Sequence, residues 1–252
     1  MWHKLVRSAR APNFRIGLPG TLVLPVYRHL LIALFCCFAF GASNASRAPV
    51  LVELFTSEGC SSCPPADRVL QQLDADAIVL SEHVDYWDQL GWKDAFSSHS
   101  LTERQMNYGR QLGLDQVYTP EMVVDGKVEF NGGDGGRARG EIAKAAQRPK
   151  AQVTITRTGS GLQVDVKDAP HSATVFLAVA DNADASQVGA GENKGHRLQH
   201  VSVLRELRKL GTVKKGGNFS LPVLAPAASQ RLVVFVQESG QGAIEGAAVW
   251  MP

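Results

Sequence analysis

The sequence predicts an α/β domain over residues 48–148, followed by a β-rich, sandwich-like domain over residues 149–252. Short apolar runs alternate with helical patterns in the first part, which favours parallel strand–helix–strand units. Seven short segments with strand character follow within about 100 residues, and Gly-containing turns separate several of them. Hydrophobic residues make up 44% of the 252 residues, which is enough for a sizeable core.

The first elements of the α/β part are a strand, a helix and a second strand. Residues 50–55 form a nearly continuous apolar run that is typical of a buried strand, interrupted by Glu53. Residues 63–73 repeat apolar side chains at helical spacing, and prolines are tolerated in the first turn of a helix. Residues 77–87 predict the next buried strand, which completes a βαβ unit.

Turn and cap signals predict the rest of this part. Ser100 and Glu103 fit a capping box at the start of a second helix. Asp125-Gly126 lies between two apolar stretches and predicts a hairpin with a two-residue turn. A Gly-rich stretch then leads into a helix over residues 137–148. The predicted order is β-α-β-α-β-β-α.

The C-terminal part consists of alternating segments. Residues 201–210 are ambiguous, because their apolar positions fit neither the strand nor the helix period. The segments that we expect to be strands are AQVTITR, LQVDVKD, ATVFLAVAD, HRLQHVSVLREL, NFSLPV, QRLVVFVQE and AIEGAAVW.

Residues 1–45 have the composition of a signal peptide. They carry five basic and no acidic residues, and the apolar run over residues 30–40 precedes small residues that suit cleavage after Ala45. We therefore expect a periplasmic or secreted protein. The alternative is an uncleaved leader, which would be the chain's membrane contact. The remaining chain holds 21 basic residues (26 less these five) against 24 acidic ones, which gives no support for nucleic-acid binding.

Cleavage would leave two cysteines, Cys60 and Cys63, because Cys36 and Cys37 belong to the leader. A disulfide across so short a loop constrains the chain very little. We therefore expect a bridge that is made and broken rather than a structural staple. Three interpretations are open at this point: a redox centre, half of a metal site, or an inert pair.

The motif Cys60-Ser61-Ser62-Cys63 after a buried strand, with Thr119-Pro120 before a later strand, resembles the thioredoxin superfamily. This resemblance covers roughly residues 48–148 and implies a thioredoxin-like fold. It also implies a cis bond before Pro120, with the proline facing the cysteines. The longer stretches VELFTSEGCSSCPPAD, HVDYWDQLGWKD, YTPEMVVDGK and GENKGHRLQHVSVLREL resemble a secreted bacterial thioredoxin-like family known as domain of unknown function 1223. That second resemblance covers nearly the whole mature chain and implies no particular substrate.

The chemistry expected of the pair follows from its position. A thiol near a helix N-terminus is acidified by backbone N–H groups, so Cys60 is the expected exposed nucleophile. Cys63 would then attack the mixed disulfide and release the partner. The resemblance implies that Glu53 is the buried acid that assists Cys63, although Glu53 is one residue further from the cysteines than in thioredoxins. The alternative for Glu53 is a structurally paired strand residue.

The resemblance implies that Thr119 and Pro120 shape a groove for an extended peptide. The predicted function is thiol–disulfide exchange with protein thiols or disulfides and a redox partner. It needs no cofactor beyond the redox-active disulfide Cys60–Cys63. The sequence does not distinguish an oxidase, a reductase and an isomerase. The alternatives are a non-catalytic redox-sensing or partner-binding module and, third, a metal-binding chaperone.

A metal site at Cys60 and Cys63 would need two further ligands. His196 and His200 are four residues apart, but their context favours a strand, so no metal ligands are predicted. Two other segments have two interpretations each. The loop over residues 189–195 either folds over the cysteines or only connects strands. The aromatic residues of DYWDQLGW either pack in the core or border the redox site.

Overall fold

The computed structural model describes residues 48–159 and 161–252, together with Asn13 and Gly17. Apart from these two residues, the predicted signal peptide over residues 1–45 lies outside the described part of this chain. The described residues from 48 to 252 cluster as a single compact unit of mixed α/β structure. Among the described residues, no helix has the length and apolar character needed to cross a membrane.

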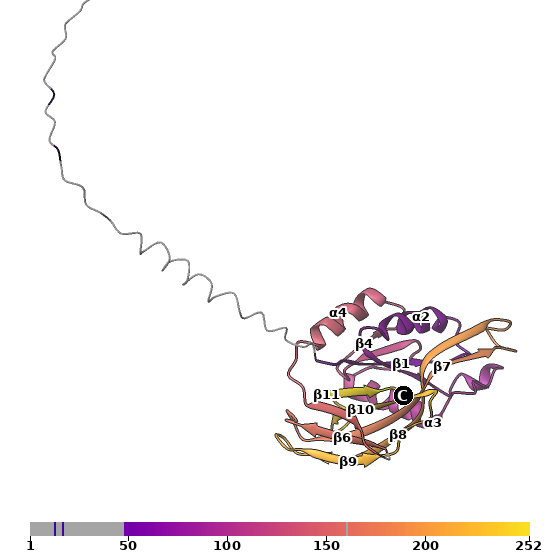
Figure 1. Ribbon diagram of the computed structural model, residues 1–252. Coiled ribbons are helices and arrows are strands. Elements are labelled where there is room, and N and C mark those ends of the chain that lie inside the picture. The colour runs from indigo at the N-terminus through magenta and orange to yellow at the C-terminus, as the bar shows by residue number, and fades with distance from the viewer. Residues whose placement is uncertain (1–12, 14–16, 18–47, 160) are drawn as a thin grey trace, which may run out of the picture. The chain divides into compact units, whose positions relative to one another are not determined.

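A large sheet runs through both predicted domains (Figure 1). Its eight strands lie in the order β11-β10-β7-β8-β2-β1-β3-β4. The chain therefore contributes strands to this sheet on both sides of the boundary predicted at residue 149. The strands of this sheet are β1 (Leu51–Thr56), β2 (Ile78–His83), β3 (Glu121–Val124), β4 (Val128–Asn131), β7 (Ala173–Gln187), β8 (Arg197–Val213), β10 (Gln230–Glu238) and β11 (Ile244–Trp250).

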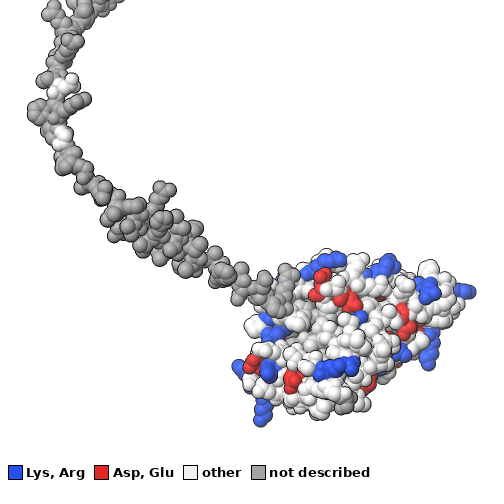
Figure 2. All heavy atoms as spheres, in the orientation of Figure 1, with Lys and Arg blue, Asp and Glu red and all other residues white. Residues whose placement is uncertain are grey.

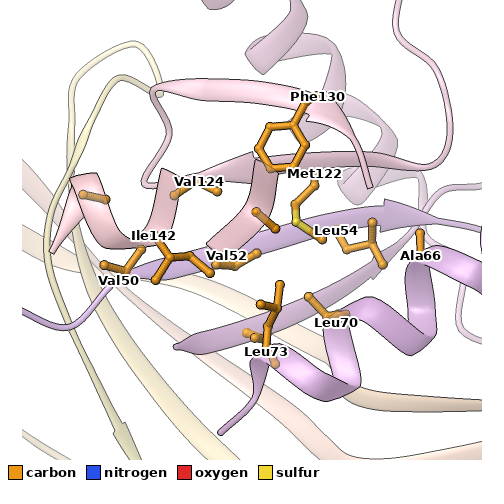
Figure 3. Packing of buried hydrophobic residues seen from close by; sticks show 13 residues of the cluster. Val50, Val52, Leu54, Ala66, Leu70, Leu73, Met122, Val124, Phe130 and Ile142 are labelled. Atoms are coloured by element: carbon orange, nitrogen blue, oxygen red, sulfur yellow. The ribbon is translucent and has the colours of Figure 1, made fainter. Parts of the chain in front are cut away.

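One face of β1, β3 and β4 is covered by α2 (Cys63–Leu73) and α4 (Gly135–Ala145) (Figure 3). Val52 and Leu54 of β1 point to this face, and Leu70 and Leu73 of α2 pack against them. Alternation along β1 sends Glu53 and Phe55 to the other face. There α3 (His99–Leu112) covers the sheet, with Tyr108 against Phe55 at a ring distance of 6.0 Å.

A second sheet has three strands in the order β5-β6-β9. Its apolar side chains pack with those of β7 and β10, such as Leu177 and Val234, in one buried cluster. This is the sandwich-like packing expected of the C-terminal part, although one of its two layers belongs to the large sheet. The strands of the second sheet are β5 (Gln152–Arg157), β6 (Leu162–Lys167) and β9 (Phe219–Val223).

Two local predictions differ from the structure. Helix α3 begins two residues earlier than the predicted capping box, since its N-cap is Ser98 rather than Ser100, and no side chain caps it. The ambiguous residues 201–210 are part of the strand β8. Pairing with β7 leaves Arg205 and Leu210 as extra residues, and each such bulge reverses the alternation of inward and outward side chains. That is why neither period fitted.

Candidate functional site

A disulfide joins Cys60 and Cys63 at the start of α2. Cys63 is the first residue of the helix, and Cys60 lies in the preceding turn, where its carbonyl accepts from the Cys63 N–H at 3.2 Å. The Ser62 hydroxyl lies 3.3 Å from Cys60 Sγ, and it is the donor here because a disulfide sulfur carries no hydrogen. Both cysteines are fully buried, with 0% exposure. The expected exposed position of Cys60 is therefore wrong for this conformation.

The loop over residues 189–195, between β7 and β8, covers the cysteines. The Asn193 side chain donates to the carbonyls of Glu58 and Cys60, at 2.8 and 2.9 Å. The carboxylate of Glu192 accepts from the Ser61 N–H at 3.1 Å. Gly191 has φ +71°, and a Cβ on this residue would lie 3.3 Å from Trp92 Cβ, so the backbone of the loop packs closely against the tryptophan. Of the two interpretations of this loop, folding over the cysteines is confirmed, and we call it the 189–195 lid.

Glu58 connects the turn before the disulfide to β7 and to the loop that follows β2. Its carboxylate accepts from Trp92 Nε1 at 2.8 Å and from the Ser186 hydroxyl, which comes from β7. Its own N–H donates to Asp94 Oδ2 at 2.9 Å. Burial acts to raise the pKa of Glu58, but hydrogen bonds from His200, Ser186 and Trp92 hold that pKa below its ordinary value.

Two histidines from neighbouring strands meet behind Glu58. His83 ends β2 and is bonded through Nδ1 to Asp94 Oδ2 at 2.7 Å. His200 of β8 lies edge-on to His83, with ring centroids 4.7 Å apart, and Phe96 packs against both rings. Both imidazoles are buried, at 0% and 3% exposure.

His200 connects two acids that come from different elements. Its Nε2 lies 3.5 Å from Glu58 Oε1, and its Nδ1 lies 3.7 Å from Asp67 Oδ2. Asp67 also accepts from the Thr56 hydroxyl at 2.9 Å. Asp67 is four residues after Cys63 on α2, and side chains at this spacing are neighbours on a helix face. We call Glu58, Asp67, His83, Asp94 and His200 the disulfide-side cluster.

The charges in this cluster shift one another's proton affinity. Burial raises the pKa of Asp67, although His200 and His83 act to lower it. Burial acts to lower the pKa of His200, but the carboxylates of Glu58, Asp67 and Asp94 raise it overall. Burial acts to raise the pKa of Asp94, but His83 lowers it. Asp67 and His200 are therefore the members of this cluster whose proton affinity is raised, and Asp67 lies one helical turn from Cys63.

The structure brings Thr119 and Pro120 towards the start of α2. Their peptide bond is cis. Trp87 Nε1 donates to the Thr119 hydroxyl at 2.8 Å, and Trp87 Cβ lies 3.1 Å from where a Cβ on Gly59 would be. On the other side, a Cβ on Gly132 would lie 3.1 Å from Ala66 Cβ and 3.5 Å from Pro120 Cβ. Aromatic residues thus border the site, as one of the two interpretations of DYWDQLGW proposed.

Glu53 does not join the cysteines. It points to the opposite face of β1, where its carboxylate accepts from Arg104 Nε at 2.7 Å and from the Tyr108 hydroxyl at 2.5 Å. Its predicted role beside Cys63 is therefore wrong, and the alternative of a structurally paired strand residue is correct.

Burial and the nearby Glu53 raise the pKa of Glu82 well above its ordinary value. We call Glu53, Glu82, Arg104 and Tyr108 the arginine cluster.

The sequence interpretation missed Asp67 and His200. Asp67 had a signal, because it lies with Ala66, Leu70 and Leu73 on the buried face of α2, where a lone acid needs a reason. His200 had only a weak signal, since regular alternation at the start of β8 places it on the same face as the apolar Leu198 but does not show which residues it meets. His196 and His200 do not share a helix face, because the first is exposed before β8 and the second is buried in it.

Comparison with known proteins places this site within a family. The family model described as "Protein of unknown function (DUF1223)" matches residues 51–237, which include both cysteines and the lid. The crystal structure of protein AGR_C_4864 from Agrobacterium tumefaciens is 28% identical in sequence, with a TM-score of 0.72, over 82% of this chain and 96% of that chain. HBP35 of Porphyromonas gingivalis is similar in fold alone, at 15% identity and a TM-score of 0.51, over 81% of this chain and 75% of that chain. No curated protein matches the chain.

Proposed function

The chain belongs to the DUF1223 family of proteins of unknown function, and we propose that it performs thiol–disulfide exchange through Cys60 and Cys63. The observation that carries this proposal is the Cys60–Cys63 disulfide at the first turn of α2, with a cluster of proton-exchanging side chains beside it. The element order β1-α2-β2-α3-β3-β4-α4 and the Thr119–Pro120 bond support a thioredoxin-like arrangement for residues 48–148. The composition of residues 1–45 supports export to the periplasm or beyond.

The exchange begins when a partner thiolate attacks Cys60 Sγ. The Cys60–Cys63 bond breaks, its electron pair leaves on Cys63 as a thiolate, and a mixed disulfide joins the partner to Cys60. A second thiol of the partner then attacks the partner's sulfur and releases the Cys60 thiolate. The partner loses two electrons and the Cys60–Cys63 pair gains them. The reverse sequence reduces a partner disulfide.

The residues around the disulfide have roles in these steps. Ser62 can donate its hydroxyl to the Cys60 thiolate as it donates to the sulfur now. Asp67, on the next turn of α2, can accept or return the proton of Cys63, and His200 lies 3.7 Å behind Asp67. Thr119 and Pro120 shape the groove for the partner's extended chain. The lid must open first, because neither sulfur is exposed.

The test is an equilibrium with glutathione. Wild type is incubated in reduced and oxidised glutathione mixtures covering about −120 to −300 mV, and free thiols are trapped and counted by mass. We expect a two-electron transition at Cys60 and Cys63. Cys63→Ser should accumulate a mixed disulfide with glutathione at Cys60, whereas the matched variant Cys60→Ser should not. A pair that stays oxidised over this whole range, with no mixed disulfide in Cys63→Ser, would contradict the proposal.

A second candidate is a non-catalytic module that reports redox state through the lid. The closed lid favours it, because Asn193 and Glu192 bind the backbone beside the disulfide and would lose these contacts if that backbone moved. Turnover separates the two candidates. Catalysed reduction of insulin disulfides above the rate of Cys60→Ser supports exchange. A reducible pair without turnover supports the module.

A further inference from the structure

Three metal-ligating side chains meet away from the cysteines. His171 lies just before β7, Glu238 ends β10 and Glu245 lies in β11. His171 Nδ1 is 3.0 Å from Glu238 Oε1 and 3.1 Å from Glu245 Oε2. The candidate ligand atoms of the three residues all lie within 4.8 Å of one another.

A β-bulge aims Glu245 at this point. In the β10–β11 pairing, Val236 is opposite Gly246 and Gln237 is opposite Ile244, so Glu245 is the extra residue. A bulge re-aims a side chain that regular alternation would place elsewhere. The Glu245 side chain is only 9% exposed, so a buried carboxylate is held against His171.

The carboxylates of Glu238 and Glu245 share one nitrogen of His171. A neutral imidazole offers at most one N–H at Nδ1, for which the two carboxylates compete. Among the described residues, the ion pairs that Glu238 and Glu245 make within 4.0 Å are both with His171, so a cation between them would have no lysine or arginine to displace.

His99 shows what an ordinary surface histidine with two acidic neighbours looks like. Its Nδ1 lies 3.1 Å from Asp85 Oδ2, whereas its Nε2 lies 3.9 Å from Glu103 Oε1. The two acids are on opposite sides of the ring and cannot share one ion with the same nitrogen. At His171 both acids converge on Nδ1, which is the arrangement that chelation requires.

We propose that His171, Glu238 and Glu245 bind a divalent transition-metal ion of the zinc class. One imidazole nitrogen and two carboxylate oxygens suit such ions. Bonds of about 2.0–2.2 Å at tetrahedral angles separate ligand atoms by about 3.3–3.6 Å. The two separations from His171 Nδ1, at 3.0 and 3.1 Å, need to grow by only a few tenths of an ångström, and the separation between the two carboxylates already lies within 4.8 Å. The fourth position is open to water, since the His171 side chain is 60% exposed. Glu238 also lines a cavity of about 460 Å³, which gives a small molecule room beside the ion.

The experiment is a calorimetric titration of Zn²⁺ into the full chain at pH 7.5. The protein is kept in its disulfide form and its remaining thiols are alkylated, so that cysteines cannot bind the metal. We expect one ion per chain and a weakening of about tenfold or more in both His171→Ala and Glu245→Gln. Co²⁺ gives an independent readout, because its visible spectrum reports tetrahedral nitrogen and oxygen ligands.

The matched control is His99→Ala, which removes another exposed histidine with two acidic neighbours and should leave the titration unchanged. His171 is exposed, so its variant tests binding without disturbing the core. An absent 1:1 binding event would overturn the proposal and leave an ordinary ion pair of His171 with the two glutamates. Binding that both variants retain at full strength would overturn it as well.

Discussion

The disulfide-side cluster and the arginine cluster are buried next to opposite faces of β1 and β2, and they differ in what balances their acids. In the arginine cluster a guanidinium, which is always charged, binds Glu53 through more than one nitrogen, and Tyr108 donates to the same carboxylate. In the disulfide-side cluster the acids face two imidazoles, and they raise the pKa of one of these, His200, above its ordinary value.

The surroundings extend this difference. Arg104 also donates to Gln237 of β10 and to Tyr108, so it connects α3 to a distant strand. His200 lies 3.5 and 3.7 Å from its two acids and borders a cavity of about 500 Å³ beside α2. One cluster is suited to hold helices and strands together, and the other is suited to exchange protons near a disulfide. The outer surface makes no such distinction, because acidic and basic side chains are interspersed on the face shown in Figure 2.

The largest effect should come from removing the arginine. Arg104→Met leaves Glu53 buried without its counter-charge, and we expect the free energy of unfolding at pH 7.5 to fall by about 3–5 kcal/mol. Guanidinium denaturation measures it. Arg110→Met, an exposed change on the same helix, should stay within about 0.5 kcal/mol of wild type. A loss of less than about 1 kcal/mol in Arg104→Met would remove the structural role of the arginine cluster.

Glu121 limits the contrast, because it lies on the α3 side of the sheet and still titrates near neutrality. Burial raises its pKa from 4.5 to about 7, with Glu129 and Glu53 adding to the effect and Gln105 opposing it. The folded protein thus keeps a proton that the unfolded chain releases, so this group makes stability fall as pH rises from about 4.5 to 7.

Glu121→Gln should remove that fall. Relative to wild type, the variant should be equally stable at pH 4 and more stable at pH 8, by at most about 3 kcal/mol, which corresponds to the difference between the two pKa values. Denaturation at pH 4, 6 and 8 checks it. Glu103→Gln, an exposed change on α3, should show no such trend. A constant difference across pH would mean that Glu121 is ionised throughout.

Glu53 shows what the sequence could and could not predict. The apolar runs and the Asp125-Gly126 turn determine local structure over a few residues, so β1, α2, β2 and the β3–β4 hairpin were predicted close to their observed bounds. The position of Glu53 depends on a register that one residue reverses, and its partner Arg104 is 51 residues away. The sequence could place Glu53 on a strand but could not say which face it occupies.

The candidate site could likewise be predicted only where its residues form a short motif. Cys60 and Cys63 could be identified because they form a compact motif, and the loop over residues 189–195 could be singled out with folding over the cysteines as one of its two interpretations. The disulfide-side cluster could not, since it assembles residues from the β1–α2 turn, α2, β2, the following loop and β8. Continuation of the sheet from β2 into β8 brings His200 to this place, and this pairing between residues more than 100 positions apart has no local signature.

His200→Gln tests whether the disulfide-side cluster depends on a titrating group. His200 faces Glu58, Asp67, Asp94 and His83, and its pKa in the folded state is raised above 6.5. A raised histidine pKa stabilises the folded protein fully below pH 6.5, and this contribution is lost as pH rises through the folded-state value. Wild type should therefore exceed the variant by about 1–2 kcal/mol at pH 5.5 and by less at pH 8.5.

Denaturation of both proteins at pH 5.5, 7 and 8.5 measures this difference, with the exposed His99→Gln as the control. His99→Gln should differ from wild type only slightly at every pH. If the gap between wild type and His200→Gln grows as pH rises, His200 is neutral in the folded protein, and the two clusters do not differ in the way argued above.

The smallest effect concerns the lid that separates the disulfide from solvent. Asn193→Ala removes two hydrogen bonds to the carbonyls of Glu58 and Cys60, at 2.8 and 2.9 Å, and should destabilise the closed lid by about 1 kcal/mol. Since both sulfurs are buried, reduction must follow lid opening, and local opening occurs without global unfolding. A change of about 1 kcal/mol should speed reduction of the disulfide by dithiothreitol about fivefold. The neighbouring Lys194→Ala, an exposed change in the same loop, should leave the rate unchanged. Equal rates in Asn193→Ala and Lys194→Ala would show that the lid does not limit access, and the disulfide-side cluster would then be open to partners in the conformation described here.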